Sequence, residues 1–176
     1  MSDILTRVSQ AKRERDKKLD LHDFSGMDLS RADLTEVSAE KTRFTGAKMN
    51  GALLRGAVLT RAKFSGAKLK GADLTGVDAS GADFTGADLR GACLAHANLE
   101  EADFTQADLE KADLRGAVLK GADMSGANLK KTNLQGIEIS GGELESALDL
   151  PASWTGDHHH SVLRMKNQKK RGRPRE

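Results

Sequence analysis

The sequence predicts a four-sided solenoid, that is, a chain wound into stacked coils of twenty residues. Two periodicities predict it. A five-residue pattern of Gly, Ala, a short polar residue, Leu or Phe and a variable residue runs from Leu21 to Glu145, and none of its 25 quintets has a polar fourth residue. All five phenylalanines stand twenty residues apart, so four quintets make one coil. A fixed repeat period is the signature of a repeat architecture.

A period of five excludes an ordinary helix or strand. Five helical steps rotate a side chain by about 140°, which would spread the apolar residues around the helix. Five steps along a strand move a side chain to the opposite face. The fourth residues can share one direction only if the chain turns a corner in every quintet. The second residue, Ala in 17 of 25 quintets, then also points inward, and Gly opens 15 quintets where a corner needs a positive φ.

The fourth residues are predicted to stack in four columns that form the core. One column consists of Phe24, Phe44, Phe64, Phe84, Phe104 and Met124. Leu89 and Leu94 belong to the second and third columns. The fourth column holds two small residues, Ala39 and Ala79, and each has Val instead of Ala two positions earlier. Because a packed core conserves volume, this compensation supports the inward assignment of both positions.

The repeated A-(D/N)-L-x-x pattern, as in GADFTGADLRGACLAHANLEEADFT over Gly81–Thr105, resembles the pentapeptide-repeat proteins. The resemblance covers about 70% of the chain. It implies an all-β fold, a right-handed four-sided parallel β-helix. At about 4.8 Å per coil, residues 21–145 make about six coils and a rod roughly 30 Å long. Some members of the family mimic duplex DNA, bind DNA gyrase or topoisomerase IV, and protect them from quinolones.

An N-terminal capping helix is expected over residues 1–20. Helical spacing runs from Ser2 to Leu19, with apolar residues on one face at positions 4, 5, 8 and 11. A solenoid needs a cap because its first coil otherwise exposes the core. The alternative is a basic helix that binds a membrane or nucleic acid.

A C-terminal cap is expected over residues 146–156. Leu148, Leu150 and Trp154 would cover the last coil, and Pro151 would end regular pairing. The alternative is a ligand site centred on Trp154. Residues 157–176 are polar and basic, and we expect them to form a flexible tail.

The tail contains a short basic motif that resembles an AT-hook. Its residues are Lys169, Lys170, Arg171, Gly172, Arg173, Pro174 and Arg175. Gly172 would let the backbone lie flat in the minor groove of A·T-rich DNA, which Arg171 and Arg173 would enter. The lysines would contact phosphates. The alternatives are a solubilising tail or one that binds polyanions in general.

The composition indicates the cellular compartment of the protein. The single cysteine, Cys93, excludes an internal disulfide and fits a reducing environment. No apolar run approaches 18 residues, and the charged N-terminus lacks a signal-peptide core. We therefore expect a cytoplasmic protein that does not contact membranes.

Catalytic and metal chemistry find little support in the sequence. Cys93 and His96 would point from different corners, and no third partner is evident. The run Asp157–His160, which includes His158, could hold a metal ion, although adjacent histidines in a tail usually bind nothing specific. We expect no enzyme activity, no cofactor, no metal and no small-molecule substrate.

Charge is segregated along the repeats. Residues 41–70 carry eight bases and no acid, whereas residues 71–113 carry ten acids and two bases. Eleven quintets have Asp in third position, which suits either DNA mimicry or local hydrogen bonds at the corners. Because one half is basic, the rod is a poor copy of DNA.

The functional expectation is a non-catalytic binding or scaffold protein. It would bind a partner protein, and its tail would tether it to nucleic acid. One alternative is a DNA mimic that binds DNA gyrase or topoisomerase IV. Another is a docking module of a secreted or effector assembly that uses the charge-segregated face.

Overall fold

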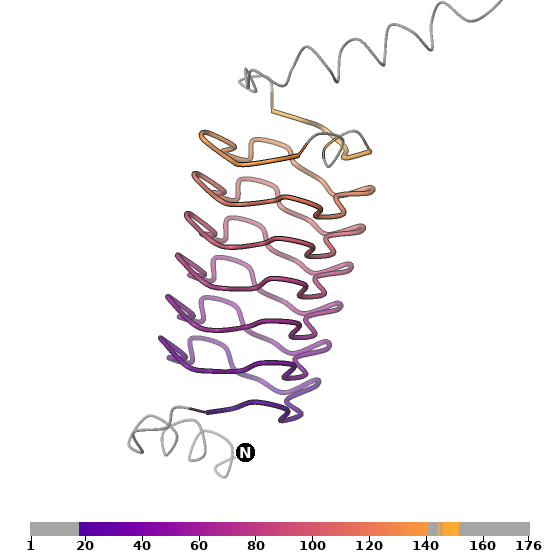
Figure 1. Cartoon of the computed structure of the whole chain (residues 1–176). Coiled ribbons are helices and arrows are strands. Elements are labelled where there is room, and N and C mark those ends of the chain that lie inside the picture. The colour runs from indigo at the N-terminus through magenta and orange to yellow at the C-terminus, as the bar shows by residue number, and fades with distance from the viewer. Residues whose placement is uncertain (1–17, 141–143, 145, 152–176) are drawn as a thin grey trace, which may run out of the picture.

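The computed structural model describes residues 18–140, 144 and 146–151. These residues wind into a stack of coils that forms a straight rod (Figure 1). Every β-bridge between described residues is parallel and joins a residue to the one twenty positions later, from Lys18 with Ser38 to Asn128 with Leu148. The twenty-residue coil predicted from the phenylalanine spacing is therefore confirmed.

No helix occurs in the described residues, and each side of a coil pairs through the single third residue of its quintet. In Gly86–Arg90 the first, third and fourth N–H groups donate to carbonyl oxygens of neighbouring coils over 2.8–3.0 Å. The second donates to the carbonyl of Phe84 in the preceding quintet at 2.9 Å. Only the N–H of the fifth residue lacks a backbone acceptor, so a side chain must supply one.

The first residue of each quintet forms the corner. All 24 corner residues from 21 to 136 have φ between 53° and 71°, the left-handed region that favours glycine. Fourteen of them are glycine, as the sequence predicts. The other ten are Leu21, Arg31, Glu36, Lys41, Arg61, His96, Glu101, Gln106, Lys111 and Lys131.

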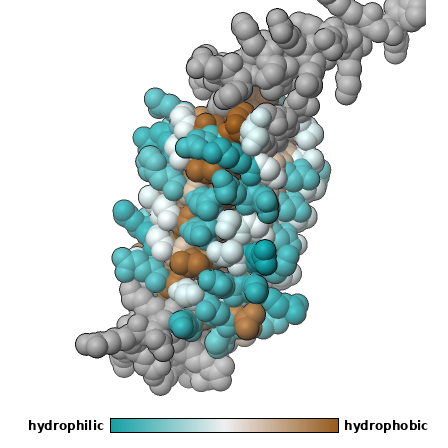
Figure 2. Space-filling model, viewed as in Figure 1, coloured by the Kyte–Doolittle hydropathy of each residue, from teal (hydrophilic) through white to brown (hydrophobic). Residues whose placement is uncertain are grey.

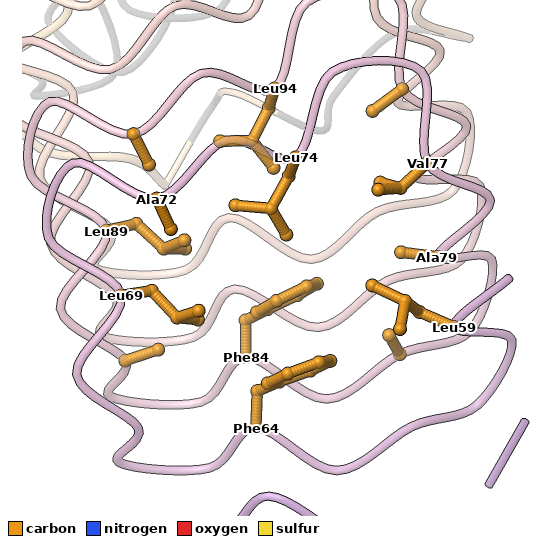
Figure 3. Packing of buried hydrophobic residues seen from close by; sticks show 14 of the residues in the cluster. Leu59, Phe64, Leu69, Ala72, Leu74, Val77, Ala79, Phe84, Leu89 and Leu94 are labelled. Atoms are coloured by element: carbon orange, nitrogen blue, oxygen red, sulfur yellow. The ribbon is translucent and has the colours of Figure 1, made fainter. Parts of the chain in front are cut away.

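The second and fourth residues fill the interior. The five phenylalanines form one column of stacked rings, with centroids 4.8–5.5 Å apart and planes 6–13° apart. Figure 3 shows two of them, Phe64 and Phe84, one above the other. Met124 continues this column and is fully buried, as are Leu89 and Leu94 in the neighbouring columns. Val77 and Ala79 are buried together, so the volume compensation expected of them exists in the structure.

The N-terminal boundary differs from the prediction. Lys18 pairs with Ser38, and Leu19 is buried as the fourth residue of one more quintet. These two residues belong to the first coil and not to the end of a helix. The rest of the capping helix expected over residues 1–20 lies outside the described residues.

The C-terminal boundary also differs. Leu148 does not cover the last coil, because it pairs with Asn128 as a third residue and its side chain is 54% exposed. Leu144 is buried, and Leu150 packs against the core as expected. Trp154 and the tail of residues 157–176 lie outside the described residues.

Candidate interaction surface

The third residues define four sides of the rod, which we label A to D. Side A carries Asp23, Arg43, Lys63, Asp83, Asp103 and Asp123. Side B carries Asp28, Lys48, Lys68, Asp88, Asp108 and Asn128. Side C carries Asp33, Leu53, Asp73, Cys93, Asp113 and Asn133. Side D carries Lys18, Ser38, Val58, Asp78, Asn98, Val118 and Glu138.

Charge is segregated on sides A and B alone. A basic patch covers their second and third coils, and with the adjoining corner and fifth residues it consists of Lys41, Arg43, Lys48, Arg61, Lys63, Lys68 and Lys70. An acidic patch follows on the same two sides and consists of Asp83, Asp88, Glu101, Asp103, Asp108, Glu110 and Asp123. The face of the rod seen in Figure 2 is mostly hydrophilic, with small separate hydrophobic spots.

Like charges are stacked within each patch. Arg43 pairs directly with Lys63, and Lys48 pairs directly with Lys68. Neighbouring coils are about 4.8 Å apart, and like charges directly opposite each other destabilise a sheet by some tenths of a kcal/mol. An alternating order of acids and bases would remove this repulsion.

Acids border the basic patch at both ends. Arg43 lies 3.6 Å from Asp23, and Lys63 lies 3.7 Å from Asp83. On side B, hydrogen bonds with Ser30 and the nearby charge of Lys48 hold the pKa of Asp28 below its usual value. These interactions are exposed to solvent, so each contributes little to stability. The acids thus offset positive charge only at the outer edges of the patch. Inside the patch, Arg43 still faces Lys63 and Lys48 still faces Lys68.

The third-position aspartates have a local structural role. Each of the eleven accepts a hydrogen bond from the N–H two residues later, over 2.8–3.3 Å, and Asn98, Asn128 and Asn133 do the same. This bond satisfies the fifth N–H of the quintet. The expectation that Asp serves the corner backbone is therefore confirmed.

The bases of the patch cannot accept that bond, because ammonium and guanidinium groups have no lone pair to offer. Where Lys68 stands in third position, the N–H of Lys70 turns instead to the side chain of Asn50 in the preceding coil, at 3.1 Å. The basic residues on sides A and B thus replace a residue type that completes the local hydrogen bonding.

Two bases of the patch stand at corners. Lys41 (φ 53°) and Arg61 (φ 57°) follow one another in the corner column that precedes side A, where glycine stands at Gly81 and Gly121. A side chain in this backbone region costs about 1 kcal/mol relative to glycine. The sequence signal for these two residues is a base where the repeat expects Gly, which our sequence interpretation did not use.

Cys93 and His96 are not brought together. The Cys93 sulfur lies 3.1 Å from the hydroxyl of Thr75 on side C, whereas His96 forms the corner that precedes side D. Among the residues that the structure describes, no three His, Cys, Asp or Glu side chains form a group that could hold a metal ion. The Asp157–His160 run and the basic motif Lys169–Arg175 lie outside these residues.

No helix in the described part of the chain is long and apolar enough to cross a membrane. The interior of the described rod is filled by apolar side chains and by two buried threonines, Thr42 and Thr132, whose hydroxyls donate to the carbonyls of Leu19 and Leu109, and the charged groups line the outside. The charged sides A and B are therefore the candidate functional surface.

Comparison with known proteins points to one family. A family model described as pentapeptide repeats matches eight copies over residues 23–56, 40–76, 67–106 and 97–136. A pentapeptide repeat protein from the thylakoid lumen of Arabidopsis thaliana is 28% identical, with a TM-score of 0.54, over 88% of this chain and 92% of that one. No protein of curated function matches the sequence.

A second solved structure is that of QnrB1, a plasmid-mediated fluoroquinolone resistance protein. It is 19% identical, with a TM-score of 0.53, over 89% of this chain and 92% of that one. At this identity the likeness shows the fold alone.

Proposed function

Because the chain belongs to the pentapeptide-repeat family, whose members are right-handed quadrilateral β-helices, we propose that it is a non-catalytic docking module. In this proposal the basic patch binds an acidic surface of a partner protein. The observation that carries it is the stacking of Arg43 on Lys63 and of Lys48 on Lys68, on two adjacent sides of the rod.

Three features of the patch act against stability, and all three place positive charge outside. Like charges are paired across coils, four third positions forgo the corner hydrogen bond, and two bases occupy left-handed corners. Each costs a few tenths to about 1 kcal/mol. Left-handed corner side chains and third positions without Asp or Asn also occur elsewhere on the rod, whereas bases paired directly with bases occur only in this patch among the described residues. Charges that repel each other without a gain in packing are typical of an interaction site.

The acidic patch argues that the partner of the rod is a protein and not a nucleic acid. A duplex lying along sides A and B would reach past the third coil and meet Asp83 and Asp103. A protein surface can present acids to the basic patch and bases, or nothing charged, beyond it. Complementary charge of this kind mainly sets orientation and rejects wrong partners.

Affinity capture with crosslinking and mass spectrometry tests the proposal in the native host. Partners should be captured by the wild type, lost with Lys63→Glu and Lys68→Glu, and retained with the matched control Lys111→Glu and Lys131→Glu on another corner column. Crosslinks of the wild type should concentrate on the lysines of the basic patch. Unchanged partners in the first variant would refute the docking role.

The absence of catalysis is part of the proposal. It is supported by an interior filled mainly with Ala, Leu and Phe side chains, in which the two buried polar side chains, Thr42 and Thr132, are bonded to backbone carbonyls. A nucleophile, a base and an orienting group need to converge in a concave site. Cys93 and His96, the candidate pair, lie on different parts of the coil.

A second candidate function is contact with nucleic acid through the tail. The observation that favours it is the Lys169–Arg175 sequence, which places arginines on both sides of Gly172. Titration of an A·T-rich duplex at two salt concentrations tests it, since phosphate contacts make affinity fall steeply with salt. Equal affinity after deletion of residues 166–176 would exclude this role.

Mimicry of duplex DNA is the remaining alternative. It predicts that the protein rescues DNA gyrase or topoisomerase IV from quinolone-stabilised cleavage. The basic patch weakens it, because a DNA mimic needs acids along its whole length. The local bonds made by all eleven third-position aspartates weaken it further. A rescue assay without effect at micromolar protein would dispose of it.

We propose the cytoplasm as the compartment, on the basis of the single cysteine. A docking role in a secreted or effector assembly would use the same basic patch. The capture experiment distinguishes a cytoplasmic role from a role in a secreted or effector assembly, because the identities of the captured partners indicate their compartment.

A further inference from the structure

We propose that two copies of the rod pair side by side and antiparallel through side A. This inference rests on the proposed docking function and names a partner for it, a second copy of the same chain. In the pair, the basic patch of each copy lies on the acidic patch of the other.

Side A carries both halves of a self-complementary pattern. The order along its third residues is acid, base, base, acid, acid, acid, and the change of sign falls between Lys63 and Asp83. A two-fold axis at that level, perpendicular to the rod, sets Lys63 opposite Asp83 of the second copy. It also sets Arg43 opposite Asp103. The coil spacing is the same in both copies, so each further row stays in register.

The adjoining corner column follows the same symmetry. It contains Leu21, Lys41, Arg61, Gly81, Glu101 and Gly121. The axis that matches Lys63 with Asp83 also sets Lys41 opposite Glu101, and Leu21 opposite Gly121. Leu21 is 74% exposed, the most exposed large apolar side chain that the structure describes, and opposite it lie Gly121 and the Cγ methylene of Glu101, which leans over that glycine. The corner thus supplies an ion pair and an apolar contact at matching heights.

Side A is also the side that permits close approach. Its fifth residues are all short and uncharged: Ser25, Thr45, Ser65, Thr85, Thr105 and Ser125. The fifth residues of side B include Lys70, Arg90, Glu110 and Lys130, whose long side chains would hold a second rod away. On side B, moreover, Arg90 already lies 2.7 Å from Asp88 and 3.5 Å from Asp108.

The charge order fixes the orientation. Parallel rods would set bases against bases and acids against acids over the whole side. The antiparallel arrangement leaves one like-charged row, Asp23 opposite Asp123, at each end of the interface. Asp23 is bound there by Arg43 of its own chain at 3.6 Å. A two-fold pair uses the same surface on both copies, so the assembly closes at two chains and does not grow into a filament.

Sedimentation of the full chain tests the pairing. A two-chain mass is expected at low salt and a one-chain mass at about 0.5 M salt, where the screening length falls to a few ångströms. Arg43→Asn with Lys63→Asn should give a one-chain mass at low salt. These asparagines restore the corner bonds, so this variant is expected to fold. The matched control Lys111→Glu with Lys131→Glu should keep the two-chain mass.

A charge swap tests complementarity directly. A variant with Arg43→Glu and Lys63→Glu has an acidic side A, and a variant with Asp83→Lys and Asp103→Lys has a basic one. Each alone should be a single chain at low salt, and an equal mixture should form a mixed pair. A mixture that stays as single chains, although circular dichroism shows that both variants are folded, would overturn the proposal.

Zero-length crosslinking tests the orientation. Lys41 and Glu101 are three coils apart in one chain, about 14 Å at about 4.8 Å per coil, which is too far for an amide bond between their side chains. In the antiparallel pair they face each other, so carbodiimide should join them between two chains. A wild type with a single-chain mass at low salt overturns the pairing. The capture experiment above tests the docking function separately, because a partner lost with Lys63→Glu and Lys68→Glu supports docking whether or not that partner is a second copy of this chain.

Discussion

The imidazole of His96 lies over Gly116, one coil further on, so close that a methyl group on Gly116 would come within 2.6 Å of Nδ1. The same relationship holds at every described corner where a side chain precedes a glycine by twenty residues. The covered glycines are Gly51, Gly56, Gly81, Gly116, Gly121 and Gly126. A corner side chain therefore leans toward the next coil and uses the space that a glycine leaves there.

Gly116→Ala should lower the free energy of unfolding more than Gly86→Ala does. Both substitutions put a side chain at φ of 62–64°, which costs about 1 kcal/mol. Only Gly116 has a neighbour in the way, and displacing a stiff ring should cost about 1–2 kcal/mol more. Chemical denaturation of both variants measures the difference.

A double variant supplies the control. His96→Gly should stabilise Gly116→Ala by more than the roughly 0.5–1 kcal/mol that it gives the wild type through relief of its own left-handed strain, because it also removes the ring. Equal effects of the two alanine substitutions, or no rescue by His96→Gly, would show that the corner side chain does not constrain the coil above it.

Arg61→Gly should stabilise the fold and weaken the binding of partners to the basic patch. Glycine removes the left-handed strain of Arg61 and raises the free energy of unfolding by roughly 0.5–1 kcal/mol. It also removes a charge from the basic patch, so capture of partners should decrease. Gln106→Gly is the control, since it relieves the same kind of strain outside the patch and should leave capture unchanged. A loss of stability in either variant would contradict the assigned strain.

The sequence predicts the coil better than it predicts the ends. The period of the phenylalanines and the exchange of volume between Val77 and Ala79 are properties of the core, where close packing constrains residue types. The N-terminal boundary was wrong because Lys17 stands where the repeat has Ala, which hid the fact that Leu19 keeps the five-residue spacing. Leu148 was assigned to a cap because it is apolar, whereas it occupies an outward third position.

The functional surface was predictable only in part. The basic and acidic blocks are visible in the sequence, and the twenty-residue column places Arg43 next to Lys63. The strain at Lys41 and Arg61 needs backbone angles, and so does the way that each corner side chain covers the next coil. Those features depend on how coils stack in three dimensions, which the repeat pattern does not specify.

Acid should destabilise the rod. The guanidinium groups of Arg90 and Arg115 hydrogen-bond to Asp88 and Asp113 and hold the pKa of each carboxyl below its usual value. A carboxyl with a lowered pKa in the folded state contributes stability above its unfolded pKa of about 3.9. That contribution is lost as the pH falls through the folded pKa.

Thermal unfolding at pH 7 and at several values below about pH 4 measures this effect. Asp88→Asn keeps the acceptor for the N–H of Arg90 and removes the titrating group. The variant should therefore lose less stability between neutral and acid pH than the wild type. An identical pH dependence would mean that the Asp88–Arg90 pair does not contribute to acid unfolding.

Leu89→Lys should unfold the rod. Leu89 is fully buried, and an unpaired ammonium group in its place costs more than about 4 kcal/mol. Leu53→Lys is the matched control, because Leu53 is 43% exposed on side C and its substitution should be tolerated. Circular dichroism and thermal unfolding distinguish the two. A folded Leu89→Lys variant of wild-type stability would refute the inward direction of the fourth residues.

We infer that the bases on sides A and B lower the free energy of unfolding and at the same time form a charged docking surface. Replacing Arg43, Lys48, Lys63 and Lys68 with Asn tests it in one variant. Asparagine restores the corner hydrogen bond, as Asn98 shows in the structure, and removes both like-charge contacts. These gains should exceed the loss of the exposed ion pairs with Asp23 and Asp83.

Denaturant unfolding and affinity capture of this single variant therefore give the decisive comparison. The account predicts a free energy of unfolding at least about 1 kcal/mol above that of the wild type, together with the loss of captured partners. A variant that is less stable than the wild type, or one that keeps its partners, would contradict it.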